Sequence, residues 1–269
     1  MTQSLLKVSI STVLASAALL PLSASATNGY QLIGVGSYQK SLGGAVTANP
    51  GSAMTAITNP AGIIRIGQRA DFSMEAIMPT RSTDFSAFGG DEVESDSDLY
   101  GVPAIGWTAP VGDRDDLYFG GGMYGTSGLG VDYAETLMMP AGASFTGNDI
   151  VWDGYSNIAF WQMAPTLAWN PSENLSLGFA LNIDYQQVSF SQRMRDTVYG
   201  ATYNFDLSRS ANAFGFGLTF GLLYDVSESF TFGFSYKSKQ HFSDLEYNLR
   251  DGDIDTTLVG GPAFPSGKY

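Results

Sequence analysis

Runs of residues that alternate between large apolar and small or polar side chains dominate the chain after residue 68. In Phe214–Tyr224 every even position is Phe, Leu or Tyr, and Gly or Thr occupies most of the positions between them. Leu175–Tyr185 and Phe230–Tyr236 show the same rhythm. Successive side chains of a strand point to opposite faces, so each run predicts a β-strand with one greasy face and one small or polar face.

Run length and aromatic placement separate a membrane barrel from a soluble β-sandwich, which shows the same alternation. The runs are about twice as long as the ~5–6 residues usual for a globular strand. Membrane-barrel strands need about 9–11 residues to cross the bilayer and carry aromatic residues at both interfaces. Such residues stand near the ends of the runs: Tyr185, Tyr224, Phe230, Tyr236, Trp161 and Trp169. We therefore predict an all-β fold, a transmembrane antiparallel β-barrel.

The connections between the predicted strands alternate between short and long. We predict strands at 69–80, 100–110, 117–125, 157–170, 175–190, 211–226 and 229–243. The short connections are 111–116, 171–174 and 227–228, and the long ones are 81–99, 126–156 and 191–210. Outer-membrane barrels have short periplasmic turns and longer extracellular loops, so this alternation predicts a periplasmic N-terminus.

The N-terminal part of the chain divides into a signal and a strand-free segment. Residues 1–26 predict a secretory signal peptide, with Lys7, the apolar run Val8–Leu22 and the cleavage motif Ala24-Ser25-Ala26. The apolar run is shorter than the about 20 residues that a membrane helix needs. Residues 27–64 are rich in Gly, Ala and Ser, and we expect them to form a compact hatch inside the barrel of residues 65–269.

Charge and cysteine content exclude several classes of partner. The net charge of −13 argues against nucleic acid, because neutralising phosphates requires clustered Lys and Arg. Without any Cys, the chain is neither a lipoprotein nor a disulfide scaffold. Acidic residues concentrate in the predicted loop 81–99, which is either simply solvated or a place where divalent ions bridge to lipopolysaccharide.

Two irregular positions interrupt the strand pattern. Gly120-Gly121-Gly122 stands inside a predicted strand, where Gly weakens pairing and often marks a bulge or a close backbone approach. Pro165 lacks the N–H that a ladder hydrogen bond needs. Either both are tolerated irregularities, or a kink at these positions opens a hole in the barrel wall.

The start of the mature chain and the segment before its first strand resemble a known family. Asn28-Gly29-Tyr30 followed by a Gly/Ser-rich stretch, and Asn59-Pro60-Ala61 ahead of the first strand, are similar to the FadL-type long-chain fatty acid transporters. Leu175–Tyr185 and Phe214–Tyr224 look like the same family. The resemblance covers nearly all of the mature chain, and the N-terminal motif is its most specific part.

The resemblance implies a 14-stranded outer-membrane barrel whose N-terminal segment folds inward as a hatch, and we expect the protein to be a monomer. Family members pass long-chain fatty acids or other aliphatic or aromatic compounds across the outer membrane. Exit through a kink in the third strand, near the Asn-Pro-Ala motif, is also implied, and Gly120–Gly122 fall in that strand. Tyr30 aligns with an aromatic residue near the family's ligand pocket and is a candidate gate residue.

The number of strands departs from the family pattern. Only about seven or eight predicted strands precede Tyr269, and the last residues read as a loop. An open sheet would leave unpaired backbone groups in lipid, where each costs several kcal/mol. We therefore expect the sequence to be a fragment of a longer protein.

Basic residues near the upper ends of two strands are candidate partners for a ligand carboxylate. A bulge at Gln186-Gln187 would turn Arg193 and Arg195 toward the lumen, and strand parity places Lys237 and Lys239 there as well. A carboxylate in an apolar pocket needs such a partner, because an unpaired buried charge is very costly. Alternatively, these residues reach solvent or lipopolysaccharide at the outer rim.

An apolar cluster in a predicted extracellular loop is a candidate surface for capturing ligands. Leu137, Met138 and Met139 fall in the predicted loop 126–156. Exposed apolar clusters often mark contact sites, and Met adapts to varied hydrophobic ligands. Packing of the loop on itself is the alternative.

No pattern in the sequence predicts catalysis, a metal site or a cofactor. Ser37-Tyr38-Gln39-Lys40 matches S-x-x-K without its companion motifs. Asp251-Gly252-Asp253 lacks the remaining residues of a calcium loop. We expect passive uptake of hydrophobic compounds. The alternatives are a structural or surface-interaction barrel, in which 27–64 is only a plug, and a secreted soluble β-protein.

Overall fold

The computed structural model of the protein describes residues 32–260 and 266–268. The chain divides into two compact units, residues 1–30 and 31–269, and the first lies outside the described residues. The predicted signal peptide and Asn28, Gly29 and Tyr30 therefore fall outside them too. Within the described part, no helix is both long and apolar enough to cross a membrane.

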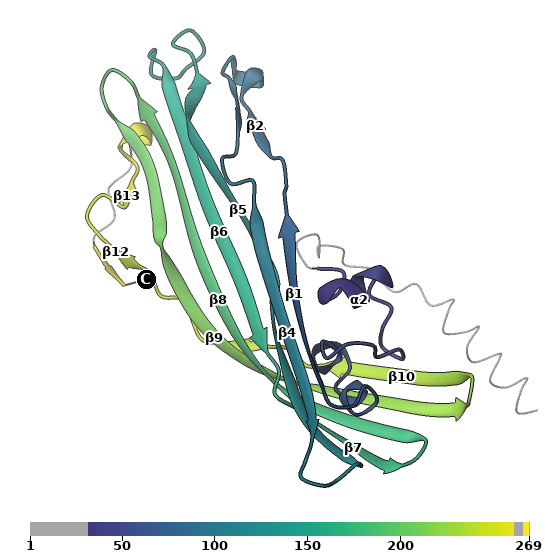
Figure 1. The fold of residues 1–269 in the computed structure, drawn as a ribbon. Coiled ribbons are helices and arrows are strands. Elements are labelled where there is room, and N and C mark those ends of the chain that lie inside the picture. The colour runs from purple at the N-terminus through teal and green to yellow at the C-terminus, as the bar shows by residue number, and fades with distance from the viewer. Residues whose placement is uncertain (1–31, 261–265, 269) are drawn as a thin grey trace, which may run out of the picture. The chain divides into compact units, whose positions relative to one another are not determined.

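One large antiparallel sheet makes up most of the second unit (Figure 1). Its main strands are β1 (Arg69–Ile77), β4 (Tyr100–Pro110), β5 (Leu117–Met139), β6 (Ile150–Met163), β7 (Thr166–Ser172), β8 (Leu175–Asp196), β9 (Thr202–Ser227) and β10 (Phe230–Lys237). The order across the sheet is β1-β4-β5-β6-β8-β9-β10, and β7 pairs with β5 and β8. Apart from β7, main strands that follow one another in sequence thus pair along this path.

Short elements complete the unit. β2 (Ser82–Asp84) and β3 (Glu92–Glu94) form a hairpin around the short helix η2 (Ser86–Phe88). β11 (His241–Phe242) and β13 (Ile254–Asp255) pair with β9, while β12 (Asn248–Leu249) pairs with β14 (Gly267–Lys268). The short helix η3 (Thr257–Val259) follows β13.

The strands extend well beyond the predicted bounds. β5 continues to Met139 and β6 begins at Ile150, so the connection predicted at 126–156 shortens to 140–149. β8 and β9 likewise shorten the connection predicted at 191–210 to 197–201. The apolar pattern ends sooner because it reports only which face meets an apolar environment. Backbone pairing continues past that point, as at Asp153↔Arg193.

Leu137, Met138 and Met139 therefore end a strand, and their prediction as part of a loop is wrong. They are half-buried. The amide of Asp91, after the turn of the β2–β3 hairpin, donates to the carbonyl of Leu137 at 2.9 Å. Gly90 packs closely against the Met138 carbonyl group: a Cβ atom added at Gly90 would lie 2.3 Å from the Met138 carbonyl oxygen. The hairpin thus packs on this end of β5.

Residues 32–64, the described part of the segment predicted to be a hatch, consist of short helices and turns, and we keep the name hatch for them. α2 (Gly36–Ser41) contacts β1, whereas η1 (Pro60–Ile64), which follows α3 (Thr55–Thr58), contacts β7, β8 and β9. In Figure 1 these purple and blue elements lie between β1 and β10. We call the face of the sheet that they contact the inner face.

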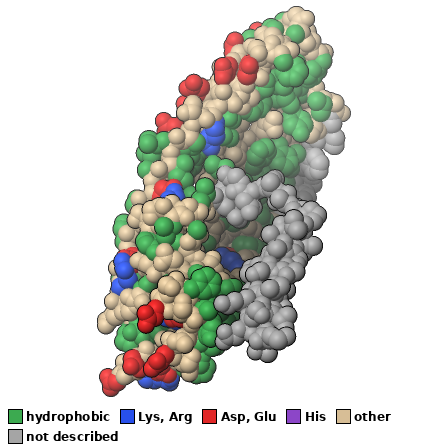
Figure 2. All heavy atoms as spheres, turned by 90° about the vertical axis from the view of Figure 1, so that its right-hand side faces the viewer, with side chains coloured by type: hydrophobic (Ala, Val, Ile, Leu, Met, Phe, Trp, Pro, Cys, Tyr) green, Lys and Arg blue, Asp and Glu red, His purple; other side chains and the backbone are tan. Residues whose placement is uncertain are grey.

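The two faces of the sheet differ in the side chains they carry. On β8, Ala180 and Asn182 are buried on the inner face, while Phe179 and Leu181 on the outer face are 49% and 41% exposed. This alternation confirms the predicted parity of the strand. In Figure 2, most acidic side chains lie toward the upper and lower ends of the molecule. An exposed apolar outer face between polar ends is what a bilayer requires.

Candidate functional site

Glycines on the inner face bring the hatch into direct contact with the backbone of the sheet. A Cβ atom added at Gly106 would lie 2.6 Å from the carbonyl carbon of Ala53, closer than non-bonded carbon atoms approach. The same holds at several other positions. The contacts are Gly106 with Ala53, Gly122 with Ile57, Gly178 with Ala61, Gly221 with Asn59 and Gly233 with Ala48. Because Gly has no side chain, the hatch and the wall pack without a gap at these points.

Asn59-Pro60-Ala61 rests on a pair of glycines in β8 and β9. Gly178 and Gly221 face each other across the two strands. A Cβ at Gly178 would lie 2.1 Å from the Ala61 nitrogen, and one at Gly221 would lie 2.1 Å from Asn59 Oδ1. The motif was expected to lie beside Gly120–Gly122; it lies instead against Gly178 and Gly221, and Gly122 faces Ile57, two residues earlier in the hatch.

The buried side chain of Asn59 ties the motif together. Its Nδ2 donates to the carbonyl of Thr47 at 2.6 Å and to that of Leu222 in β9 at 3.3 Å. Its Oδ1 accepts from the amide of Ala61 at 3.2 Å and so caps η1. One side chain therefore joins two segments of the hatch to the wall, which explains why Asn is needed ahead of Pro60.

We predict that Asn59→Ala loosens the hatch without unfolding the sheet. Leaving buried carbonyls and an amide without partners costs about 1–3 kcal/mol. Amide hydrogen exchange in residues 55–64 should speed up roughly tenfold or more, while exchange in β8 and β9 stays unchanged. Asn49→Ala, at an exposed position of the hatch, serves as the control. If amide hydrogen exchange in residues 55–64 were equally fast in the two variants, Asn59 would not be what holds the hatch to the wall.

Polar side chains of the sheet hold the hatch at further points. Asp71 of β1 accepts from the amide of Ala53 at 2.7 Å, and Ser235 of β10 donates to the carbonyl of Thr58 at 2.7 Å. Since β1 and β10 stand at opposite ends of the strand order, the hatch bridges the whole width of the sheet. Two ion pairs add to this: Lys40 with Glu75 and Arg65 with Asp225.

The wall is interrupted beside the glycine triplet. β6 ends at Met163 and β7 begins at Thr166, leaving Ala164 and Pro165 between them. Ala164 still exchanges backbone hydrogen bonds with Gly122, at 2.8 and 3.4 Å. Pro165 has no N–H to donate, so the ladder resumes only where Thr166 pairs with Gly120.

The expected kink in the third strand does not break β5, and the interruption lies instead in its neighbour, between β6 and β7. β5 runs unbroken through Gly120–Gly122, and its pairing with β4 continues there in register. A register shift of β5 against β6 falls later, between Gly125 and Ser127. Glycine keeps both backbone hydrogen-bonding groups, whereas proline loses one, which is why Pro165 rather than the triplet breaks the wall.

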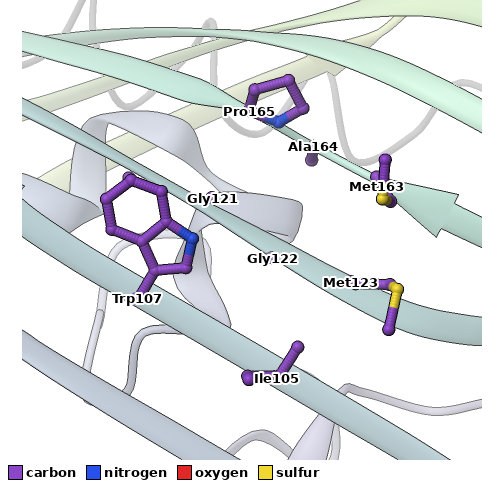
Figure 3. Close-up of a pocket in the computed structure, with 9 residues that line it drawn as sticks. Ile105, Trp107, Gly121, Gly122, Met123, Met163, Ala164 and Pro165 are labelled. Atoms are coloured by element: carbon purple, nitrogen blue, oxygen red, sulfur yellow. The ribbon is translucent and has the colours of Figure 1, made fainter.

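A small cavity, which we call the notch, opens on the outer face at this interruption (Figure 3). Its volume is about 230 Å³. The residues that line it are Ile105, Trp107, Gly120, Gly121, Gly122, Met123, Met163, Ala164 and Pro165. Trp107 is 41% exposed, and its ring packs edge-on against the ring of Phe119, with the ring centroids 5.2 Å apart. The notch is thus apolar and has only glycine at its centre.

Ile57 lies directly behind the notch, on the inner face. A Cβ at Gly122 would lie 2.6 Å from Ile57 Cδ1. Ile57 is 4% exposed and packs in an apolar cluster with Met54, Tyr124 and Ala164. Only a glycine backbone separates this hatch side chain from the outer face.

A polar row crosses the inner face next to this cluster. Tyr124, Gln162 and Asp184 are direct neighbours across β5, β6 and β8. Gln162 Nε2 donates to Asp184 Oδ1 at 2.6 Å, and Lys237 Nζ reaches over from β10 to donate to Gln162 Oε1 at 2.6 Å. Tyr124, Gln162 and Asp184 are buried, with 9%, 2% and 5% exposure. We use the term polar row for these three residues and Lys237.

The basic residues predicted to face the lumen are placed differently from one another. Lys237 reaches the inner face, as its hydrogen bond to Gln162 shows. Lys239 is exposed and lies beyond the end of β10.

Arg193 and Arg195 do not follow the prediction. β6 and β8 pair without a shift from Ile150↔Asp196 to Met163↔Ile183, so the predicted bulge at Gln186-Gln187 is absent from this ladder. Strict alternation then puts both arginines on the face opposite Asp184. They pair there with carboxylates: Arg193 with Asp153 at 2.8 Å and Arg195 with Glu135 at 3.0 Å. The register shift lies instead between β8 and β9, at Val188 and Phe190.

Sequence reasoning missed Ile57, Gly178, Gly221 and Asp184. The glycines carried a signal, since each stands on the small face of a strongly alternating strand. That a backbone segment would dock on them depends on the pairing of two strands, which the sequence does not display. In the described residues, no group of three or more His, Asp or Glu side chains could hold a metal ion.

Comparisons with known proteins place the fold. Residues 15–257 match a family described as "Outer membrane protein transport protein (OMPP1/FadL/TodX)". No curated protein sequence matches the chain.

Three solved structures with a similar fold are distant from this chain in sequence. A TodX deltaS2S3 mutant, a monoaromatic hydrocarbon channel, is 17% identical with a TM-score of 0.65 over 80% of this chain and 57% of its own. The Ralstonia pickettii toluene transporter TbuX is 19% identical, with a TM-score of 0.60; the match covers 81% of this chain and 60% of TbuX. A Pseudomonas aeruginosa FadL homologue is 15% identical, with a TM-score of 0.55; the match covers 84% of this chain and 56% of the homologue. The chain thus spans little more than half the length of these proteins.

Proposed function

Because this chain belongs to the OMPP1/FadL/TodX family of outer membrane transport proteins, we propose that it takes part in the passive uptake of hydrophobic compounds. Long-chain fatty acids and aromatic or aliphatic hydrocarbons are the candidate substrate classes. The proposed route enters from the extracellular side past the apolar end of β5, is closed by the hatch, and leaves sideways through the notch into the membrane.

The observation that carries this proposal is the position of Ile57 behind Gly122. The wall at this point lacks side chains in its centre and lacks one ladder donor. A movement of α3 away from the wall would connect the inner face with the outer face beside Trp107 and Met163. Since the notch is apolar, a hydrophobic ligand would pass from protein to lipid without crossing water.

The energy for binding along this route would come from burying apolar surface. About 25 cal/mol is gained per Å² of apolar surface removed from water. A gate that binds its ligand in this way needs no energy source, because the ligand moves down its own concentration gradient. The hatch then has only to open and close, and its attachment to the wall sets how often it does so.

We predict that filling the notch blocks uptake. A Cβ at Gly121 would lie 3.2 Å from the Ala164 carbonyl oxygen and 3.4 Å from Pro165 Cα, so the side chain of Gly121→Leu would occupy the notch. Uptake of radiolabelled toluene and dodecanoate by cells that carry the full-length protein should fall at least tenfold. Leu129→Trp enlarges an exposed side chain of the same strand away from the notch and should leave uptake unchanged.

The same assay separates transport from a purely structural or surface-interaction role. Cells that express the protein should take up at least one of the two probes faster than cells without it. If expression makes no difference for either probe, the uptake proposal is rejected. If uptake occurs but Gly121→Leu leaves it intact, only the lateral exit is rejected.

A further inference from the structure

We propose that the polar row selects uncharged ligands that carry a hydroxyl group over carboxylates, and that Asp184 determines this preference. The inference rests on the proposed uptake function and names the substrate class that this route accepts. It concerns the inner face, where a ligand would pass just before it reaches Ile57.

The first argument is that the one cation of the row is already compensated. Lys237 donates to Gln162, which in turn donates to Asp184, so the amide of Gln162 joins the ammonium to the carboxylate. A ligand carboxylate at Lys237 would therefore add a second negative charge beside Asp184. Two like charges in a poorly hydrated site repel strongly.

The second argument is an acceptor that lacks a donor. Asp184 Oδ2 is buried and finds no hydrogen-bond partner among the described residues, although Oδ1 is satisfied by Gln162. A buried carboxylate oxygen without a donor is costly, so a ligand that supplies one is favoured. An alcohol or phenol can donate to Oδ2, whereas an ionised carboxylate is an acceptor only.

The location of the row makes it a filter. Tyr124 belongs both to the row and to the apolar cluster around Met54 and Ile57, where the hatch meets the wall. Its hydroxyl lies 3.5 Å from Gln162 Oε1. A ligand whose hydroxyl group bonds Asp184 would thus lay its apolar body along this cluster, next to Ile57 and the notch behind it.

The test compares two ligands of equal chain length, 1-dodecanol and dodecanoate. Equilibrium binding of each is measured at pH 7.5 to the full-length protein purified from outer membranes. We expect the unaltered protein to bind 1-dodecanol at least tenfold more tightly than dodecanoate. In Asp184→Asn, which keeps the size of the side chain, this ratio should fall at least tenfold because dodecanoate gains Lys237 as a partner.

Two further variants identify the groups responsible. Adding Lys237→Met to Asp184→Asn should remove the gained affinity for dodecanoate. Asp153→Asn, which removes a carboxylate from β6 on the opposite face, should leave the ratio unchanged. Heat-dependent electrophoretic mobility checks that each variant is folded.

The outcomes separate this inference from the proposed function. If the unaltered protein binds both ligands equally and Asp184→Asn changes neither affinity, the selectivity is refuted while uptake stands. If it binds neither ligand, the inference is refuted, whereas the proposed function fails only if cells that express the protein also take up neither toluene nor dodecanoate faster than cells without it. A loss of both affinities in folded Asp184→Asn would also overturn the assignment.

Discussion

Gly178→Leu is expected to release the Asn59-Pro60-Ala61 segment from the wall and leave the channel open. The backbone of Pro60 and Ala61 lies where the new Cβ would be, 2.2 and 2.1 Å away, and neither backbone nor strand can shift without breaking hydrogen bonds. Overpacking of this kind typically costs about 1–3 kcal/mol even where side chains can adjust. Here the neighbour is backbone, so we expect the upper end of that range or more.

The measurement is ion conductance of the purified full-length protein in planar lipid bilayers. The unaltered protein should be nearly silent, and Gly178→Leu should raise the fraction of time in conducting states at least tenfold. Protease cleavage within residues 55–64 should increase in parallel. Gly101→Leu is the matched control, since the nearest atom to a Cβ there is the flexible Met74 sulfur at 3.7 Å. A silent, protease-resistant Gly178→Leu would show that the glycine pair does not seat the hatch.

The family and the outer-membrane barrel fold were predictable, and both are confirmed. Alternation in Phe214–Tyr224 reports directly on a strand with two different faces, which is a local property of the sequence. The ends of the strands were not predictable in this way. Beyond the apolar band, residues such as Asp153 and Arg193 pair across strands without any apolar rhythm to mark them.

The site was predictable only in part. Asn59-Pro60-Ala61 was identified from its resemblance to the family, but its resting place depends on Gly178 and Gly221, which are brought together by strand register. The irregular positions Gly120–Gly122 and Pro165 were each visible in the sequence. That they lie side by side, with Ile57 behind them, follows from pairing between strands and from the path of the hatch.

Gating by the hatch, the central claim, can be tested by locking Ile57 to the wall. A Cβ at Gly122 lies 2.8 Å from Ile57 Cγ1, so it is at most one carbon–carbon bond further from Ile57 Cβ. Disulfides need Cβ atoms about 3.5–4.5 Å apart. The chain contains no Cys, so the double variant Ile57→Cys/Gly122→Cys offers a single possible bridge within this chain.

The most direct measurement is uptake of radiolabelled toluene and dodecanoate by cells that carry this double variant, before and after reduction with dithiothreitol. Each single-cysteine variant serves as a control for the substitutions themselves. Locking the hatch over the notch should reduce uptake of the transported probe to the level of cells without the protein, and reduction should restore it. Uptake that continues unchanged with the bridge fully formed would contradict gating by the hatch at this position.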